Sequence, residues 1–347
     1  MVFLLMFKIA ILTQGKNVPS TRFRILQYLA TFNSLSIETS VYHAYESAYP
    51  PPGLLRRLSW LLKEISVRFW QIVKINFSDV DLVIIQRELI STLPTFEWCL
   101  TKKFIFDVDD AIFLHKNGIA ARAIAKTADA VVCGNSFLSN YFSKFNSNVY
   151  EICTPVDSLR FKPSDQEYAQ KYIGWSGSSS GYHYLHSIES EIKKVLEMFP
   201  DWKLLIVADK PPEFKILTEN DFCFEKWHPD TEVSSIQKMS IGIMPLEDND
   251  WAKGKCSYKM LLYMACAVPC VVSDVGMNSE ILAINEVGLG VPCDTNGWSQ
   301  ALTKLVSSSQ LRAQMGFNGR SVIESHFSLV VSADKWFSVI KSRLSSQ

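Results

Sequence analysis

The sequence carries no excess of charge of either sign. It has 35 Lys and Arg residues against 35 Asp and Glu residues, so its formal net charge is zero. A general nucleic-acid binder presents a basic surface, and this composition gives no reason to expect one. The chain has 347 residues, 48% of them hydrophobic, which is too long for one core of ordinary size and enough for two.

Metal-binding patterns are also missing. The eight cysteines form no C-x-x-C pair, and no histidine cluster completes a zinc pattern. This spacing predicts buried free thiols in a reducing cytoplasm.

Long apolar runs are absent as well. No run of about 18 apolar residues occurs, so we expect no transmembrane helix. The opening MVFLLMFKIAILT is interrupted by Lys8 and lacks the basic start and cleavage site of a signal peptide. It predicts a first buried strand, and we expect a cytoplasmic protein.

The sequence does contain a regular alternation of short apolar runs and longer amphipathic stretches. Continuous apolarity predicts strands covered on both faces, as in a parallel sheet. The alternation pauses at the turn-rich residues 161–166 and then restarts. It predicts two doubly wound, Rossmann-like α/β domains, residues 1–160 and 165–325, with a hinge near 155–168 and a ligand cleft between them.

The predicted elements cover both domains. Strands are expected at 7–14, 36–44, 80–87, 103–110, 128–135, 149–157, 171–177, 202–209, 241–246, 269–274 and 288–293, and major helices at 21–32, 54–75 and 326–344.

One candidate anion site is GWSGSSSGYHYL, residues 174–185. It follows a predicted strand and opens a helix, with Gly177 and Ser178 in the turn. Small residues there let a phosphate approach backbone N–H groups. The motif is neither G-x-G-x-x-G nor a Walker motif, and a glycine-serine turn without a ligand is the alternative.

A second candidate is GKCSYKMLLYMACAVPCVVSDVGMNSE, residues 254–280. Lys255 and Lys259 lie at the start of an apolar helix, for which Ser257 is the expected N-cap. Cations there oppose the helix macrodipole, which favours anions. Either a polyanion lies between the two lysines, or they are solvated residues at a helix start.

Both loops belong to the second domain, where the carboxyl ends of parallel strands bring loops together. Two anion sites on one domain indicate a diphosphate. A third turn of the same domain has Gly276 and Asn278, which are flexible enough to approach a ligand, and Glu280 starts the next helix.

With these motifs in place, the sequence resembles a known family. The order WSGS, IGIMPL, KGKCSYKMLLYMACAVPCVVSDVGMNSEIL is similar to that of retaining glycosyltransferases of group 1 (family 4), which have the GT-B fold. In the first half, STRFRILQYL, IIQRE, FIFDVDDAIF, ADAVVCGNSFLSNYF and TPVDSLRFKP resemble family motifs in the expected order. The resemblance covers almost the whole chain.

The resemblance implies a function and a division of labour. The second domain would bind a nucleotide-diphosphate sugar, the first a glycan or lipid-linked glycan, and a C-terminal helix at about 326–347 would pack back on the first domain. Such enzymes transfer a sugar with retention of configuration and need neither a cofactor nor a protein-bound metal. Their usual setting is bacterial surface-polysaccharide assembly, including lipopolysaccharide.

One departure from the family is clear. Most members carry a Glu-x7-Glu motif, whose second glutamate holds the nucleotide ribose and whose first lies near the sugar or phosphate. Gly254 and Leu262 occupy those positions here, and leucine accepts no hydrogen bond. A subset of the family has Gly-Lys in place of the first glutamate, so we still expect donor binding, with Gly254 in the site.

The leaving diphosphate requires positive charge. Lys255 and Lys259 are the candidates, together with the backbone N–H groups of Gly177 and Ser178. Trp227 either walls the nucleobase pocket or is a core residue.

In the first half, DVDD at 107–110 mimics the metal-binding D-x-D motif of a different glycosyltransferase fold. The repeated βαβ pattern argues against that fold, so no metal is expected. Carboxylates at a strand end must be solvated or paired. Asp109 or Asp110 would orient or deprotonate an acceptor hydroxyl, and helix capping is the alternative.

Three further residues are placed in the cleft. Arg22 and Arg24 lie on the first predicted helix and could reach a ligand, although Arg24 could instead be an ordinary exposed residue. Asn135 comes directly after AVVCG, at the end of the strand predicted at 128–135.

The helix at 54–75 interleaves basic residues with aromatic ones. Such a helix can lie on an anionic bilayer, which would place the enzyme at the inner face of the membrane. A helix that only covers the sheet explains its leucines equally well. Its charged and aromatic residues are Arg56, Arg57, Lys63, Glu64, Arg68, Lys74, Trp60, Phe69 and Trp70.

Two other functions stay open. A GT-B nucleotide-sugar epimerase would use the same two domains without an acceptor. A degenerate glycosyltransferase-like subunit would account for Gly254 and Leu262.

Overall fold

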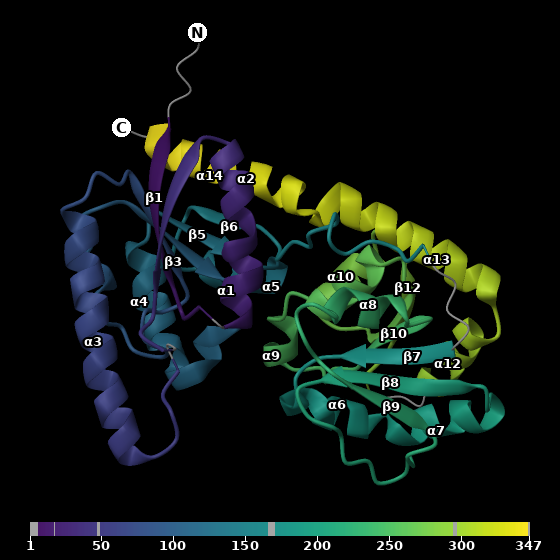
Figure 1. Ribbon diagram of the computed structural model, residues 1–347. Helices are drawn as coiled ribbons and strands as arrows, with labels where there is room; N and C mark the ends of the chain where they lie inside the picture. Colours follow the sequence, from purple (N-terminus) through teal and green to yellow (C-terminus); the bar gives the residue numbers. More distant parts are fainter. Residues whose placement is uncertain (1–5, 17, 47–48, 166–170, 294–296, 346–347) are drawn as a thin grey trace. The chain divides into compact units, whose positions relative to one another are not determined.

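The computed structural model describes residues 6–16, 18–46, 49–165, 171–293 and 297–345. The chain forms two compact units, and each contains a parallel sheet flanked by helices (Figure 1). The first unit comprises Met1–Pro155, Gly254–Cys256 and Leu329–Gln347, and the second Val156–Lys253 and Ser257–Ser328. The predicted two-part α/β fold is therefore confirmed.

The sheet of the first unit has the strand order β2-β1-β3-β4-β5-β6. Its neighbouring strands all pair in parallel, as the continuous apolar runs predict. Every residue of β3, β4 and β5 is buried. The strands are β1 (Phe7–Thr13), β2 (Ile37–His43), β3 (Leu82–Gln86), β4 (Phe104–Val108), β5 (Ala130–Cys133) and β6 (Val149–Glu151).

The helix predicted at 21–32 is not continuous. Ile25, with φ −126° and ψ −60°, leaves the helical region and separates two short helices. The helical segments of this unit are α1 (Pro19–Arg24), η1 (Leu26–Tyr28), α2 (Leu29–Ser34), α3 (Leu54–Asn76), η2 (Glu97–Cys99), η3 (Ile112–Gly118), α4 (Ile119–Thr127), α5 (Ser136–Phe142) and α14 (Leu329–Ser345).

Helix α14 completes the first unit, although it comes from the far end of the chain. Its buried Trp336 and Ile340 share one core with Ile9 of β1 and with Tyr28, and the Trp336 ring packs edge-on against Tyr28. Figure 1 shows this helix, in yellow, beside β1 and α2. The resemblance places the C-terminal helix in the same position.

The sheet of the second unit has the order β12-β11-β10-β7-β8-β9, again parallel throughout. Five strands match predicted ones, and β9 was not predicted. The strands are β7 (Lys171–Ser176), β8 (Trp202–Ala208), β9 (Phe222–Lys226), β10 (Ile241–Met244), β11 (Cys270–Ser273) and β12 (Gly288–Val291). The helical segments are η4 (Ser179–Gly181), α6 (Tyr182–Ser187), α7 (Glu189–Met198), α8 (Glu232–Gln237), α9 (Asp250–Lys253), α10 (Tyr258–Ala265), α11 (Met277–Leu282), α12 (Gly297–Val306), α13 (Ser309–Val322) and η5 (Ile323–Phe327).

The unit boundaries differ from the predicted ranges both at their ends and within the second domain. The chain passes to the second unit after Pro155, at the start of the predicted hinge, but residues 254–256 belong to the first unit. Residues 1–5 of the predicted first strand and 166–168 of the predicted hinge lie outside the described residues. Within the described residues, no helix combines the length and the apolarity that crossing a bilayer requires.

Candidate functional site

Lys259 and the Gly177 loop meet in the second unit. The Lys259 side chain on α10 extends over Trp175, with Nζ 5.4 Å from the ring centre, which is within cation–π range. A Cβ atom added to Gly177 would lie 2.7 Å from Lys259 Cε and 2.7 Å from the Trp175 ring. Two candidates far apart in the sequence are therefore neighbours beyond the carboxyl end of β7.

Several backbone N–H groups of this loop already donate hydrogen bonds within the protein, which the sequence does not indicate. The Gly177 N–H donates to the Val207 carbonyl at 3.0 Å, so the expectation that it would hold a phosphate is wrong. The Ser179 N–H and hydroxyl donate to Asp209 at 2.6 and 2.9 Å, and these bonds lower the pKa of that carboxyl. Ser178 shares a hydrogen bond of 2.5 Å with the Ser180 hydroxyl, and its role with a ligand stays a prediction.

The start of α10 is held by side chains that we expected to face a ligand. Ser257, at φ +49°, makes no side-chain cap; its hydroxyl donates to Asn278 Oδ1 at 2.7 Å. Asn278 donates in turn to the Ser273 carbonyl at 2.9 Å, and both residues are buried. The N-cap prediction for Ser257 and the ligand contact predicted for Asn278 are therefore corrected: this pair ties α10 to the turn after β11.

Three other donor-site candidates have local explanations. Gly276 has φ +55°, and an added Cβ would lie 2.9 Å from Lys253 Cα, so close packing of two backbone segments requires glycine. Glu280 is exposed on α11. Trp227 is half-buried and donates from Nε1 to Glu232 at 3.2 Å, so it is not a core residue.

The two positions without glutamate are both tightly packed. Leu262 is buried in α10. Gly254 and Ala111 both belong to the first unit and lie against each other: a Cβ added at 254 would be 2.6 Å from the Ala111 Cβ and 2.8 Å from its backbone nitrogen. Since a side chain at 254 would overlap backbone atoms, the missing first glutamate has no room in this structure.

Lys255 belongs to the first unit, whereas Lys259 belongs to the second. The two lysines were expected on one domain. The Lys255 carbonyl accepts a hydrogen bond of 3.0 Å from Asn135, whose Oδ1 caps α5 by accepting from the Leu138 N–H at 3.0 Å. Asn135 is only 1% exposed, so the predicted ligand contact is replaced by a structural role.

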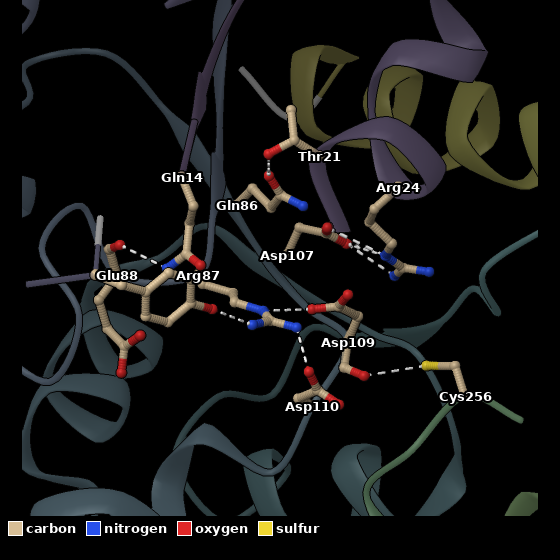
Figure 2. A network of polar contacts seen from close by, with 11 residues as sticks. Gln14, Thr21, Arg24, Gln86, Arg87, Glu88, Asp107, Asp109, Asp110 and Cys256 are labelled. Carbon is tan, nitrogen blue, oxygen red and sulfur yellow. Dashed lines mark hydrogen bonds and ion pairs between the residues drawn. The ribbon is translucent and has the colours of Figure 1, made fainter. Parts of the chain in front are cut away.

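The centre of the polar network in the first unit is Arg87, directly after β3 (Figure 2). Its Nε donates to Asp109 at 2.6 Å, Nη2 donates to Asp110, and Nη1 donates to the Tyr49 hydroxyl at 2.8 Å. Burial acts to lower the pKa of Arg87, but the two carboxylates raise it well above its ordinary value. Arg87 therefore stays charged and holds both aspartates.

The two aspartates do not cap a helix. The next helical segment, η3, begins after Ala111 with no side-chain cap, so that alternative is wrong. Burial raises the pKa of Asp110, while Arg87 and, more weakly, Lys255 oppose the rise. The Asp109 carbonyl accepts a contact of 3.2 Å from the Cys256 thiol.

A second ion pair lies deeper in the first unit. Arg24 and Asp107 are both fully buried, with donor–acceptor distances of 2.8 to 3.1 Å, and Arg24 Nη1 also donates to the Ile152 carbonyl. Burial raises the pKa of Asp107 to about 6 despite Arg24. The alternative of an exposed Arg24 is wrong, and its burial removes it from the predicted ligand contacts. Arg22 is partly exposed, with its guanidinium 4.5 Å from the Phe23 ring centre.

Sequence reasoning missed Glu88, Gln14 and Gln86, which also lie at the carboxyl ends of β1 and β3 (Figure 2). Glu88 is 3% exposed, and burial raises its pKa from 4.5 to about 7. Gln14 donates to the Glu88 carbonyl at 3.3 Å, and Gln86 accepts from Thr21 at 3.0 Å. Among the described residues, Gln14 Oε1 and Gln86 Nε2 are buried without a hydrogen-bond partner. The sequence feature that could have identified these three residues is their position at or directly after the end of a buried strand.

In the described part of the chain, no three His, Cys, Asp or Glu side chains gather in a way that could hold a metal ion. The expectation that the protein uses neither a metal nor a cofactor stays a prediction.

Comparisons with known proteins agree with this architecture. Residues 170–308 match the family model described as "Glycosyl transferases group 1". Curated protein sequences give no match. The second unit is therefore similar in sequence to group 1 glycosyltransferases.

Solved structures match the fold along the whole chain. Sucrose-phosphate synthase from Thermosynechococcus elongatus has a TM-score of 0.75 at 12% identity, covering 98% of this chain and 100% of that one. HepE from Anabaena, in complex with UDP and glucose, has a TM-score of 0.66 at 13% identity, covering 97% and 100%. A glycosyltransferase from Rickettsia africae has a TM-score of 0.66 at 14% identity, covering 99% and 100%. The chain thus has the GT-B fold.

Proposed function

We propose that the protein is a glycosyltransferase that moves a sugar from a nucleotide-diphosphate sugar to a glycan or lipid-linked glycan. The observation that carries this proposal is Lys259, which lies over Trp175 and against Gly177 within the segment that matches group 1 glycosyltransferases. A lysine that an aromatic ring and a tight glycine hold in place is a preorganised positive charge. Such a charge stabilises a leaving diphosphate most effectively when it needs no rearrangement.

The donor half of the reaction belongs to the second unit in this proposal. Lys259 neutralises charge on the diphosphate as the glycosidic bond breaks. Lys255, a residue of the first unit, stays a separate proposed catalytic residue. Gly177 contributes space for the Lys259 chain, because its own N–H is already bonded to Val207. Ser178, Trp227 and Glu280 remain proposed donor contacts.

The acceptor half belongs to the first unit. Because Arg87 already binds both Asp109 and Asp110, these carboxylates are suited to accept hydrogen bonds from acceptor hydroxyls rather than to remove protons. Glu88 has a pKa near neutral and is the better group for proton exchange. Arg22, partly exposed on α1, is the remaining proposed acceptor contact.

UDP is the first nucleotide to test, because the structure of HepE, which shares this fold, contains UDP and glucose. We expect hexosyl transfer with retention of configuration and without a metal. Purified protein would be incubated with UDP-glucose and other nucleotide sugars plus a glycan acceptor panel, with and without EDTA. NMR of the product would give the anomeric configuration, and loss of activity in EDTA would contradict metal independence.

The same incubation separates the alternatives. An isomerised nucleotide sugar formed without an acceptor would identify an epimerase. The degenerate-subunit alternative is favoured by Leu262, which cannot hold a ribose, and by the lack of room at Gly254. It predicts neither product nor nucleotide binding.

We further propose that α3 contacts an anionic membrane. Its exposed side chains are strongly apolar: Leu55 is 82% exposed, Leu62 68% and Trp70 66%. Its one acidic residue, Glu64, is buried against Arg68, while Arg56, Arg57, Lys63 and Lys74 are exposed. An exposed surface of this kind matches an anionic bilayer in both charge and apolarity. The resulting location is the cytoplasmic face of the membrane, and the pathway is surface-polysaccharide assembly.

Vesicle sedimentation tests this contact. The protein should bind vesicles that contain phosphatidylglycerol and should not bind purely zwitterionic ones. The variant Trp70→Ser should weaken binding several-fold, because an aromatic anchor is lost. Trp98→Ser is the matched control, since Trp98 is 74% exposed on η2 of the same unit. Equal binding to both vesicle types, or equal loss in both variants, would contradict the contact.

A further inference from the structure

A cavity of about 380 Å³ lies in the first unit, at the amino ends of its strands. Lys103 precedes β4 and Asp129 precedes β5, so this edge of the sheet is opposite to the edge that carries Arg87 and Asp109. Lys126, at the end of α4, and Arg343, on α14, complete its charged lining. Neither the mechanism nor the family resemblance assigns a role to this cavity.

The lining has an excess of positive charge. Three cations face the cavity with a single carboxylate, Asp129, which already accepts a hydrogen bond of 2.8 Å from the Phe104 N–H. The Lys103 ammonium donates to the main-chain carbonyl of Arg343 at 2.9 Å, and Arg343 Nη1 donates to the Asp129 carbonyl at 3.4 Å, so these three lining residues are bonded to one another. Like charges gathered in a protein of zero net charge repel one another, and a bound anion would relieve that repulsion.

The loop beside the cations is held rigidly. Asn146 Nδ2 donates to the carbonyls of Ala125 and Ala128 at 2.8 and 2.7 Å, and Asn148 Nδ2 donates to the Asp129 carbonyl at 3.1 Å. These bonds satisfy two carbonyls at the end of α4 and the carbonyl of Asp129. The cavity is thus preorganised, and its charged side chains supply the strongest contacts.

We propose that this cavity binds a phosphate group, either as inorganic phosphate or as a small phosphomonoester. A doubly charged tetrahedral anion can engage two ammonium groups and the planar guanidinium of Arg343 at once. The volume exceeds that of one phosphate and leaves room for a few further atoms. Because Arg343 lies on α14, a bound phosphate joins the C-terminal helix to the sheet and stabilises the first unit.

Isothermal titration calorimetry on the full chain tests the proposal. All proteins would carry Lys259→Ala, so that the proposed donor site contributes nothing and the two proposals fail independently. Titration with inorganic phosphate, at ionic strength matched with chloride, should give saturable binding. Glycerol 1-phosphate forms the second arm: tighter binding of the ester identifies a phosphomonoester site, and equal binding identifies a phosphate site.

Variants locate the binding. Lys126→Gln and Arg343→Gln should each weaken phosphate binding about tenfold, since each removes a charge-assisted hydrogen bond. Lys144→Gln is the control, because Lys144 is an exposed lysine of the same unit that does not line the cavity. Non-saturable heat, unchanged affinity in both cavity variants, or an equal loss in the control would overturn the proposal. Circular dichroism would verify that each variant is folded.

Discussion

Among single residues, Gly177 decides where Lys259 can lie. A methyl group at this position would lie 2.7 Å from both Lys259 Cε and the Trp175 ring. The lysine chain can move away, but the buried Trp175 ring has less freedom. In the proposed function, Gly177 therefore positions the charged group, and its own N–H, bonded to Val207, does not contact the diphosphate.

Gly177→Ala should therefore weaken nucleoside-diphosphate binding by displacing Lys259, and should cost about 1–3 kcal/mol of stability through overpacking. Calorimetry and urea unfolding would measure the two effects. Gly181→Ala is the matched control, because its added Cβ would approach Trp175 only to 3.3 Å. If both variants bind equally well, Gly177 does not position Lys259.

At position 254, the glutamate that most family members carry is predicted to destabilise this protein. Restoring the family's glutamate by Gly254→Glu should lower stability by more than 1 kcal/mol and should not improve donor binding, because a Cβ at 254 would overlap the Ala111 backbone. Thermal unfolding and calorimetry would test this. Tighter nucleotide binding in the variant would show that the site can accept the glutamate.

Glu88 makes stability depend on pH. Burial raises its pKa from 4.5 to about 7, so the folded state binds the proton more tightly than the unfolded state does. Its contribution is therefore complete below about pH 4.5 and is lost as the pH rises to about 7, by up to about 3 kcal/mol.

Glu88→Gln should remove this loss, so that the variant gains stability relative to the parent between pH 5 and 8. Urea unfolding across that range would measure it, with Glu38→Gln, an exposed change on β2, as the control. Parallel profiles for the parent protein and Glu88→Gln would show that the Glu88 carboxyl does not titrate in this range.

At the scale of elements, α3 carries a buried ion pair that connects it to the ends of several strands. Arg68 donates to the carbonyls of Thr13 and Leu89 at 2.6 and 3.2 Å, and Glu64 accepts from the Tyr45 N–H at 2.8 Å. These three residues follow or end β1, β2 and β3. The helix that we propose to contact the membrane is thus bonded to the loops of the proposed acceptor site.

Arg68→Met should cost about 3–5 kcal/mol, because it leaves Glu64 buried and unpaired. Adding Glu64→Gln should recover part of that loss, since the uncompensated charge disappears. Urea unfolding of the two single variants and the double variant would give the coupling free energy, expected to exceed about 1 kcal/mol. Additive losses would show that the pair does not act as a unit.

The elements that the sequence predicted well are those with a simple burial pattern. The continuous apolar runs of β3, β4 and β5 are buried on both faces, so their parallel pairing followed from composition. Strand β9 was missed because it is an edge strand whose sequence FCFEK is only partly buried. The break at Ile25 left no mark in an apolar pattern that continues through both helices.

At the scale of the whole molecule, the sequence predicted the two-unit fold but only part of the candidate site. Residue types indicated that Lys259 and the Gly177 loop could both hold an anion, and the structure places them together. Pairing partners could not be predicted, since Arg24 and Asp107 are 83 positions apart and nothing local links them. Arg87 was missed for the same reason, because only the folded chain brings it to Asp109 and Asp110.

The most direct test of the account is calorimetry with a panel of nucleoside diphosphates on the parent protein, Lys259→Ala and Lys171→Ala. Lys171 lies at the amino end of β7, paired with Asp201, and serves as the matched lysine control. We predict that the parent and Lys171→Ala bind at least one diphosphate, and that Lys259→Ala binds it at least tenfold more weakly while remaining folded. Unchanged affinity in Lys259→Ala, or no binding by the parent protein, would contradict the account.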